Sequence, residues 1–222
     1  VYAGHSLNSL EEIIEQKVSG YIGKTQQELK EEFKIESSPK NLNMLLFSKM
    51  IGLAGEAENA HEFRNANIIP KTICVNKDGS IKESMSFPTF KFCDIINEKW
   101  EDSELRNLIE PAKFLFVIFK KNDVDEPVFE RIKFWNIPAE DLEEVKKVWE
   151  RTVSIIKAGV QIKTYGQKTQ NNLPKSTESY VAHVRPHARN KADTYPLPDG
   201  RELTKQCFWF NSAYVKKIIA ES

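Results

Sequence analysis

Residues 113–119 have the sequence Lys-Phe-Leu-Phe-Val-Ile-Phe, in which every residue after the lysine is apolar. A short apolar run rich in aromatic and β-branched residues predicts a strand, and the lack of polar alternation predicts that both of its faces are buried. A polar turn at 122–126 follows, and residues 128–135 predict the next strand. We therefore expect a β-sheet at the centre of the fold.

The helices predicted around this sheet have clear ends. Residues 138–159 place their apolar side chains on one helical face, with acids in the first turn and a glycine at the end. Two Ser/Thr-x-x-Glu capping boxes, which begin at Ser9 and Thr25, predict helices within residues 1–36, and residues 41–51 predict another. The order of elements predicts an α/β fold, with a mixed β-sheet flanked by α-helices.

Further strands are predicted on both sides of the central run. Residues 68–75 predict a strand, in which Pro70 indicates a sheet edge or a bulge. We expect residues 85–92 to pair back with it as the second strand of a hairpin, across a turn at 77–79. The remaining segments are predicted to be short strands at 180–184 and 207–210, loops at 165–178 and 188–200, and a C-terminal helix that begins at Asn211 or Ser212.

The composition is that of a globular protein. Its 222 residues, 40% of them apolar, supply a core for a single domain, which we expect to comprise a helical segment at 1–36 and a core at 37–222. The 32 basic and 32 acidic residues balance, which excludes a polycation but not a local basic face. The three cysteines lack the spacing of a disulfide framework or a zinc site. No apolar run approaches the ~20 residues that span a bilayer, so we expect no membrane partner and a cytoplasmic location.

The segment at 160–191 contains six lysine or arginine residues and a single acid, Glu178. Such a run has two interpretations, a solvated basic loop or a surface that faces DNA. Residues 185–191, Arg-Pro-His-Ala-Arg-Asn-Lys, are expected where a strand ends in a loop. Arginine can donate two hydrogen bonds to guanine, asparagine can recognise adenine and lysine can neutralise phosphate. Pro186 is expected to stiffen the turn that presents them.

A second basic and polar segment, Thr204-Lys205-Gln206, precedes Cys207 and the aromatic residues 208–210. We assign the aromatic residues, Trp209 included, to the core. Lys205 and Gln206 fit a surface turn and a binding surface equally well. The candidate DNA-binding residues of the two segments are Arg185, Pro186, His187, Arg189, Lys191, Lys205 and Gln206.

A third segment carries the remnant of a metal-dependent nuclease motif. Such nucleases use an acid followed by Glu-x-Lys on a strand, where carboxylates hold Mg²⁺ and the lysine orients water. Glu62 and Lys71 stand at suitable spacing, but Ile69 occupies the position of the middle acid. An aliphatic side chain cannot bind a hard cation, which requires oxygen ligands. We therefore predict no metal and no catalytic residue here, with Glu62, Ile69 and Lys71 as a degenerate site.

Taken in order, these segments resemble the MutH and Sau-type restriction endonuclease family. The catalytic hairpin of that family has an acid, then Gly-Ile-Glu-Leu-Lys-Thr-Ile-Pro-Val, a turn with glycine and a second strand. Here the corresponding residues are Glu62, Asn-Ile-Ile-Pro-Lys-Thr-Ile-Cys-Val at 67–75, Gly79 and 83–87. The resemblance covers residues 40–219 and includes Trp100 to Ser103, Arg106, Trp149, Gly159-Val160, Arg185-Pro186 and Leu203 to Gln206.

The resemblance implies a restriction-endonuclease-like, MutH-like fold and a non-catalytic domain that binds double-stranded DNA at GATC sites as an allosteric effector. It is closest to the C-terminal half of the Sau-type enzymes, where a second MutH-like domain follows the catalytic one. It therefore implies an upstream catalytic domain of the same protein, a type II site-specific deoxyribonuclease, with Mg²⁺ as a cofactor of that domain alone. The start at Val1, without methionine, agrees with an upstream region. Dimerisation on DNA stays open.

The departures from the family pattern concern the metal site. The metal-binding glutamate of the family falls on Ile69 and its leucine on Pro70, and a helix acid expected near Phe47 or Ser48 is absent. Two alternatives stay open. One is an active Mg²⁺-dependent nuclease domain with rearranged ligands drawn from Glu56, Glu58 or Glu62, and the other is an interaction scaffold that has lost DNA binding.

Overall fold

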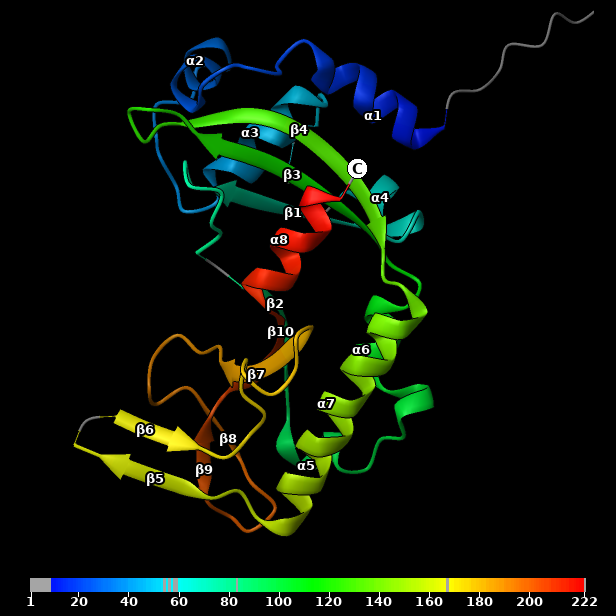
Figure 1. Ribbon diagram of the computed structural model, residues 1–222, viewed down its shortest axis with the longest axis vertical. Coiled ribbons are helices and arrows are strands. Elements are labelled where there is room, and N and C mark those ends of the chain that lie inside the picture. The colour runs from blue at the N-terminus through cyan, green and yellow to red at the C-terminus, as the bar shows by residue number, and fades with distance from the viewer. Residues whose placement is uncertain are drawn as a thin grey trace, which may run out of the picture. The chain divides into compact units, whose positions relative to one another are not determined.

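The computed structural model describes residues 9–53, 55, 57, 60–82, 84–166 and 168–221 (Figure 1). The chain divides into two compact units. Unit 1 comprises Val1–Lys82 and Ala112–Asn136, and unit 2 comprises Glu83–Pro111 and Ile137–Ser222. Each unit combines helices with small sheets, so the predicted α/β composition is confirmed. No helix in the described ranges is both long enough and apolar enough to cross a membrane.

Unit 1 is built on a mixed sheet with the strand order β1-β3-β4. Its strands are β1 (Ile68–Val75), β3 (Lys113–Lys121) and β4 (Pro127–Asn136). Strand β1 pairs with β3 in parallel, and β4 pairs with β3 in the antiparallel direction. Residues 114–119 of β3 are all 0% exposed, which confirms the predicted central, buried strand.

Helices pack on this sheet from the N-terminal part of unit 1. They are α1 (Leu10–Ser19), α2 (Gln26–Glu32), α3 (Leu42–Met50) and α4 (His61–Asn65). Both predicted capping boxes are present, because the hydroxyl groups of Ser9 and Thr25 accept hydrogen bonds from the backbone N–H groups of Glu12 and Glu28. Helices α1 and α2 contact β4, and α3 contacts β1 and β3. Their buried side chains form one apolar cluster with those of the sheet.

The prediction that β1 and β2 form a hairpin is wrong. Strand β2 (Met85–Phe90) pairs with β10 (Gln206–Phe210) of unit 2, whereas β1 pairs with β3. The predicted turn does form, since the backbone N–H of Asn76 donates to the carbonyl of Ser80 at 2.8 Å and Gly79 has a φ of 76°. The turn after β1 does not make β1 pair with β2. Strand β1 pairs with β3 instead, because β3 is apolar on both faces and is a fully buried partner.

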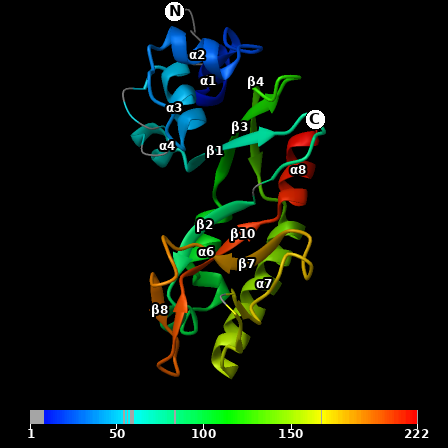
Figure 2. The same ribbon diagram turned by 90° about the vertical axis from the view of Figure 1, so that its left-hand side faces the viewer.

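Unit 2 contains an antiparallel sheet with the order β2-β10-β7, in which β7 comprises Ala182–Pro186 (Figure 2). The strands predicted at 180–184 and 207–210 are thus confirmed, with shifted ends. One face of β10 is apolar, because the ring centroid of Phe208 lies 5.1 Å from that of Phe90 and the centroid of Phe210 lies 4.8 Å from that of Phe87. The other face carries the polar residues described below.

The helices of unit 2 include the clearest one in the sequence. They are α5 (Phe92–Ile95), the 3-10 helix η2 (Trp100–Asp102), α6 (Glu104–Ile109), α7 (Ala139–Ala158) and α8 (Ser212–Ala220). The start of α7 is joined to α8, since the buried carboxylate of Asp141 accepts hydrogen bonds from the hydroxyl groups of Tyr180 at 2.6 Å and Tyr214 at 2.8 Å. The bond to Asp141 raises the pKa of Tyr180 to about 12.

Two segments predicted to be loops contain hairpins instead. Strand β5 (Ile162–Tyr165) pairs with β6 (Lys168–Asn171), and β8 (Thr194–Pro196) pairs with β9 (Glu202–Thr204). Each turn contains a glycine with positive φ, 57° at Gly166 and 82° at Gly200. Sequence patterning missed these strands because they are short and polar, so that no alternation of apolar residues marks them.

Candidate nucleic-acid interface

Pairing between β7 and β10 brings the two predicted DNA-binding segments together. Cys207 is the register partner of Arg185, and Gln206 is the partner of Pro186. Beyond the ends of these strands, the backbone N–H of His187 donates to the carbonyl of Lys205 at 2.9 Å. Residues 185–191 and 204–206 therefore meet at the ends of two paired strands, at one edge of the sheet of unit 2.

Trp209 is the residue around which this surface is organised. The guanidinium carbon of Arg185 lies 4.2 Å from the centroid of the Trp209 ring, and the ring of His187 stacks on it at 5.2 Å with an interplanar angle of 29°. The indole N–H of Trp209 donates to the carbonyl of Arg185 at 3.3 Å. These contacts restrict the side chains of Arg185 and His187 before any ligand is present. A cation over an indole ring is stabilised by about 0.5–2 kcal/mol.

The assignment of Trp209 to the core is wrong. Phe208 and Phe210 are buried as predicted, but Trp209 is half-buried and lies on the other face of β10. The signal that could have found it is the two-residue period of a strand, which places residue 209 opposite to its two neighbours.

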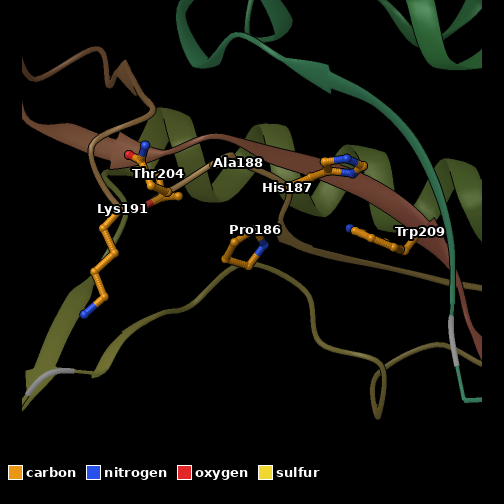
Figure 3. Close-up of a pocket in the computed structure, with 7 residues that line it drawn as sticks. Pro186, His187, Ala188, Lys191, Thr204 and Trp209 are labelled. Atoms are coloured by element: carbon orange, nitrogen blue, oxygen red, sulfur yellow. The ribbon is translucent and has the colours of Figure 1, made fainter. Parts of the chain in front are cut away.

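A hollow of about 410 Å³ opens beside Trp209 (Figure 3). It is lined by Pro186, His187, Ala188, Asn190, Lys191, Thr204 and Trp209. The side chain of Lys191 extends from the loop after β7, at the opposite end of the hollow from the ring of Trp209 (Figure 3). The hollow thus combines an aromatic wall with amide, hydroxyl and ammonium groups, which is a set of groups suited to bases and phosphates.

Asp193 fixes the loop that follows β7. Its carboxylate accepts from the ammonium group of Lys205 at 2.5 Å and from the backbone N–H of Arg189 at 3.1 Å. The hydrogen bond from Lys205 lowers the pKa of Asp193, and the same bond raises the pKa of Lys205. The ammonium group also lies 4.6 Å from the ring centroid of Tyr195. Lys205 therefore holds the loop in place, and its charge is already compensated by an acid.

Gln206 does not share the exposed face with Arg185. Its side chain is 1% exposed, and its amide nitrogen donates to the carbonyl of Thr204 at 2.8 Å. Its Oε1 is buried and accepts no hydrogen bond from the residues that the structure describes. The reason is again strand alternation, because the register partner of Gln206 is Pro186 and not Arg185. The exposed members of the predicted set are Arg185, Pro186, His187, Arg189 and Lys191.

Two titratable groups lie beneath this face without being available to a ligand. The thiol of Cys207 lies 3.4 Å from Nδ1 of His187, but it is 0% exposed, and burial raises its pKa to about 12. A neutral, buried thiol is not a nucleophile. His183 is also buried, and its Nδ1 lies 2.5 Å from the Oδ1 of Asn211. Burial lowers the pKa of His183, with Arg185 acting in the same direction.

The degenerate nuclease motif lies in unit 1, on α4 and β1. Glu62 is exposed and Lys71 is half-buried, and no ion pair joins these two described residues. Ile69 is half-buried and Pro70 is buried, with Phe114 and Leu115 of β3 as their register partners. Within the described ranges, no group of three or more His, Cys, Asp or Glu residues is arranged to hold a metal ion.

This donor set does not fit Mg²⁺. A hard cation requires several oxygen ligands, and the central position of the motif presents the aliphatic side chain of Ile69. Pro70 also lacks the backbone N–H that the strand would otherwise contribute to its ladder. The other two acids considered above as alternative ligands, Glu56 and Glu58, lie outside the described residues.

The Trp-Glu-Asp-Ser segment and Arg106, which belong to the family pattern, have a structural role. The hydroxyl of Ser103 caps α6 by accepting from the backbone N–H of Arg106. The guanidinium of Arg106 donates to the carbonyl of Glu101 at 2.9 Å and pairs with Glu110 at 2.9 Å. The indole of Trp100 packs against that of Trp149 on α7, with ring centroids 5.7 Å apart. This part of the pattern therefore stabilises helices.

Comparison with known proteins gives the chain a relative. No family model matches the sequence. The chain is similar to the type II restriction enzyme Sau3AI of Staphylococcus aureus, with 33% identity over an alignment of 252 residues. The alignment covers 96% of this chain and 52% of the relative, so that the chain spans about half the length of the enzyme it matches. The similarity therefore extends over nearly the whole of this chain but over only one half of the restriction enzyme.

Proposed function

We propose that the chain is a MutH-like, sequence-specific domain that binds double-stranded DNA at GATC sites and acts as a non-catalytic effector of a type II restriction endonuclease. In this proposal residues 1–222 form one domain, with the helical segment 1–36 and the core 37–222. It corresponds to the C-terminal part of a longer enzyme, whose upstream domain cuts DNA with Mg²⁺.

The observation that carries the proposal is the arrangement of Arg185 and His187 on Trp209. Both side chains are exposed on a strand end, beside a hollow of about 410 Å³. Arg185 is exposed, rests on the indole ring and forms no ion pair with an acid among the described residues, so its N–H donors are available to a guanine or a phosphate. The similarity to a restriction enzyme makes duplex DNA the ligand that best fits this surface.

The chemistry of unit 1 supports the non-catalytic part of the proposal. Cleavage by a Mg²⁺ nuclease requires carboxylates around the ion, and Ile69 replaces the central one. Without a metal-bound water to orient, Lys71 is free to contact a phosphate. We therefore expect this chain to bind duplex DNA without cleaving it.

The test is duplex binding by the purified chain, measured by fluorescence anisotropy across a range of salt concentrations. A GATC duplex and a scrambled duplex of equal length and composition are compared. We expect tighter binding to GATC, with affinity that falls as salt rises because phosphate contacts release counterions. Equal affinity for the two duplexes overturns the sequence specificity, and no binding at low salt leaves the interaction scaffold as the function.

The second candidate is an active nuclease, and the similarity to a restriction enzyme is the observation that favours it. Its test is a supercoiled plasmid with several GATC sites, incubated with the chain and Mg²⁺ or Mn²⁺. We expect the plasmid to stay intact. If the unmodified chain nicks the plasmid and the Glu62→Ala variant does not, the proposed effector role is overturned and the chain is a nuclease.

A further inference from the structure

The β5–β6 hairpin of unit 2 is basic and polar on both strands. Residues 160–177 contain Lys163, Lys168 and Lys175 and no acid. The two strands pair only with each other in the described sheets, and Figure 1 shows the hairpin projecting beyond the neighbouring strands β8 and β9. An isolated two-stranded hairpin is marginally stable in water, and among the residues of its strands only Ile162 and Tyr165 are apolar or aromatic. The stability of the fold therefore does not explain why this hairpin is rich in basic and polar residues.

Two lysines of this segment, Lys163 and Lys175, carry charges that no acid among the described residues compensates. Lys163 and Lys175 are exposed, and neither forms an ion pair with any residue in the described ranges. Elsewhere in unit 2, the cations Arg151, Lys205 and Arg201 pair with Glu178, Asp193 and Asp199. The acid nearest in sequence to the hairpin, Glu178, is thus already paired with Arg151 at 2.6 Å.

Amide side chains surround these lysines. A hollow of about 190 Å³ is lined by Gln161, Lys163, Gln170, Asn171, Asn172 and Lys175. Asn171 and Asn172 shape its base, because their Oδ1 atoms accept from the backbone N–H groups of Leu173 and Gln161 at 3.0 and 2.9 Å. Lys163 and Gln170 are direct register partners, so an ammonium group and a side-chain amide leave the hairpin as neighbours. Such a set of donors fits phosphate oxygens.

The hairpin is attached to the strand that carries Arg185. Leu173 and Pro174, which follow β6, are buried, and the carbonyl of Pro174 accepts from the backbone N–H of Val184 in β7 at 2.8 Å. The base of the hairpin is therefore fixed to β7 next to Arg185, while its strands extend into solvent. A duplex bound at Arg185 has its phosphate backbone continuing beyond the contacted bases, within reach of a segment attached there.

We propose that the β5–β6 hairpin is a second DNA contact, which binds the phosphate backbone through Lys163 and Lys175 without recognising sequence. The inference rests on the proposed function, because it places the same duplex on both surfaces. The two contacts then contribute differently to binding: Arg185 provides the sequence preference, and the hairpin provides affinity that depends on salt.

The test is the double variant Lys163→Gln, Lys175→Gln, compared with a matched control, Lys99→Gln, Lys216→Gln. All four lysines are exposed in unit 2, and both variants remove two charges. The slope of log affinity against log salt should become less negative by about 2 in the hairpin variant and stay unchanged in the control. The ratio of affinities for GATC and scrambled duplexes should be the same in both variants and in the unmodified chain.

The outcomes separate this inference from the function on which it rests. If the unmodified chain does not bind duplex DNA, the proposed function fails. If it binds and the hairpin variant has the same salt slope as the control, the hairpin contact alone is overturned. A hairpin variant that loses its preference for GATC also overturns the inference as stated, because the hairpin then contacts bases and not only the backbone.

Discussion

Strand β1 of unit 1 and strand β7 of unit 2 both carry a motif that the sequence analysis singled out, and they differ in what surrounds it. On β1, Ile69 and Pro70 are the register partners of Phe114 and Leu115 in β3, and Lys71 forms no ion pair with an acid among the described residues. On β7, Arg185 rests on Trp209, and the next residues are held by Lys205 and Asp193. The first motif has lost the groups it depends on, and the second is supported by its neighbours.

The difference shows that binding and cleavage have separate structural requirements. A metal site depends on the number of oxygen ligands, so one substitution by an aliphatic residue removes it. A DNA-binding surface depends on donors held in position, and here stacking on Trp209 and the ion pair between Lys205 and Asp193 hold them. The predictions below compare the two strands directly, in order of decreasing effect.

The largest effect is expected from Arg185→Ala. It should weaken binding to a GATC duplex by about 1–3 kcal/mol and reduce the preference for GATC, because a bidentate contact to a base is lost. The comparison variant, Lys71→Ala on β1, should weaken binding to both duplexes equally. It should also make the slope of log affinity against log salt less negative by about 1, since it removes a phosphate contact only. Anisotropy titrations with both duplexes measure this. Equal losses on the two duplexes for Arg185→Ala show that it binds phosphate.

A smaller effect is expected from Trp209→Leu. The substitution removes the ring under Arg185 and His187, and it should cost about 0.5–2 kcal/mol of binding to GATC, the range of a cation–π contact. Trp209→Phe should restore most of the affinity, because it keeps an aromatic face. Circular dichroism confirms that both variants are folded. Identical affinities for the leucine and phenylalanine variants contradict the role of the ring.

Acid should destabilise the protein through His183 on β7. Its pKa is lowered in the folded state, so the unfolded chain binds more protons as the pH falls below about 6.5, the ordinary pKa of histidine. The stability it contributes is present above that pH and is lost as the pH falls toward the folded-state pKa. Urea unfolding at pH 8 and pH 5 should show a smaller acid-induced loss in His183→Asn than in the unmodified chain. An equal loss in both assigns the acid sensitivity to other groups.

The smallest effect is expected from Ile69→Glu on β1. Restoring this one acid should leave a supercoiled GATC plasmid uncut with Mg²⁺ or Mn²⁺, because Pro70 remains and the helix positions of Phe47 and Ser48 carry no acid. Both of those helix residues are 0% exposed, and the hydroxyl of Ser48 is occupied by the backbone N–H of Ala57 at 2.8 Å. Plasmid cleavage by the Ile69→Glu variant contradicts the view that several ligands are missing.

Local signals in the sequence predicted local structure well. The capping boxes at Ser9 and Thr25, the buried run of β3 and the apolar face of α7 all depend on residues close in sequence, and all are confirmed. The pairing of β1 with β3 could not be predicted in the same way, because it joins residues about 45 positions apart by burial and not by a turn. The polar hairpins β5–β6 and β8–β9 were missed, since they lack apolar alternation.

The candidate site was predicted in part for the same reason. Basic composition identified the segment around Arg185 as a candidate, and the pairing of β7 with β10 brings Lys205 close to it. Sequence composition cannot show which side of a strand a residue occupies once aromatic residues run together, so Trp209 was assigned to the core and Gln206 to the surface. The structure places each on the face opposite to that assignment.

The contacts of Asp193 have a consequence for the kinetics of association. Because this carboxylate already holds Lys205 and the backbone of Arg189, the loop after β7 has its shape before a ligand arrives. A loop that is already ordered loses little conformational entropy on binding, so encounters with DNA need not wait for it to fold. The association rate is then limited by diffusion and orientation, and differences in affinity between one DNA sequence and another arise mainly in the lifetime of the complex.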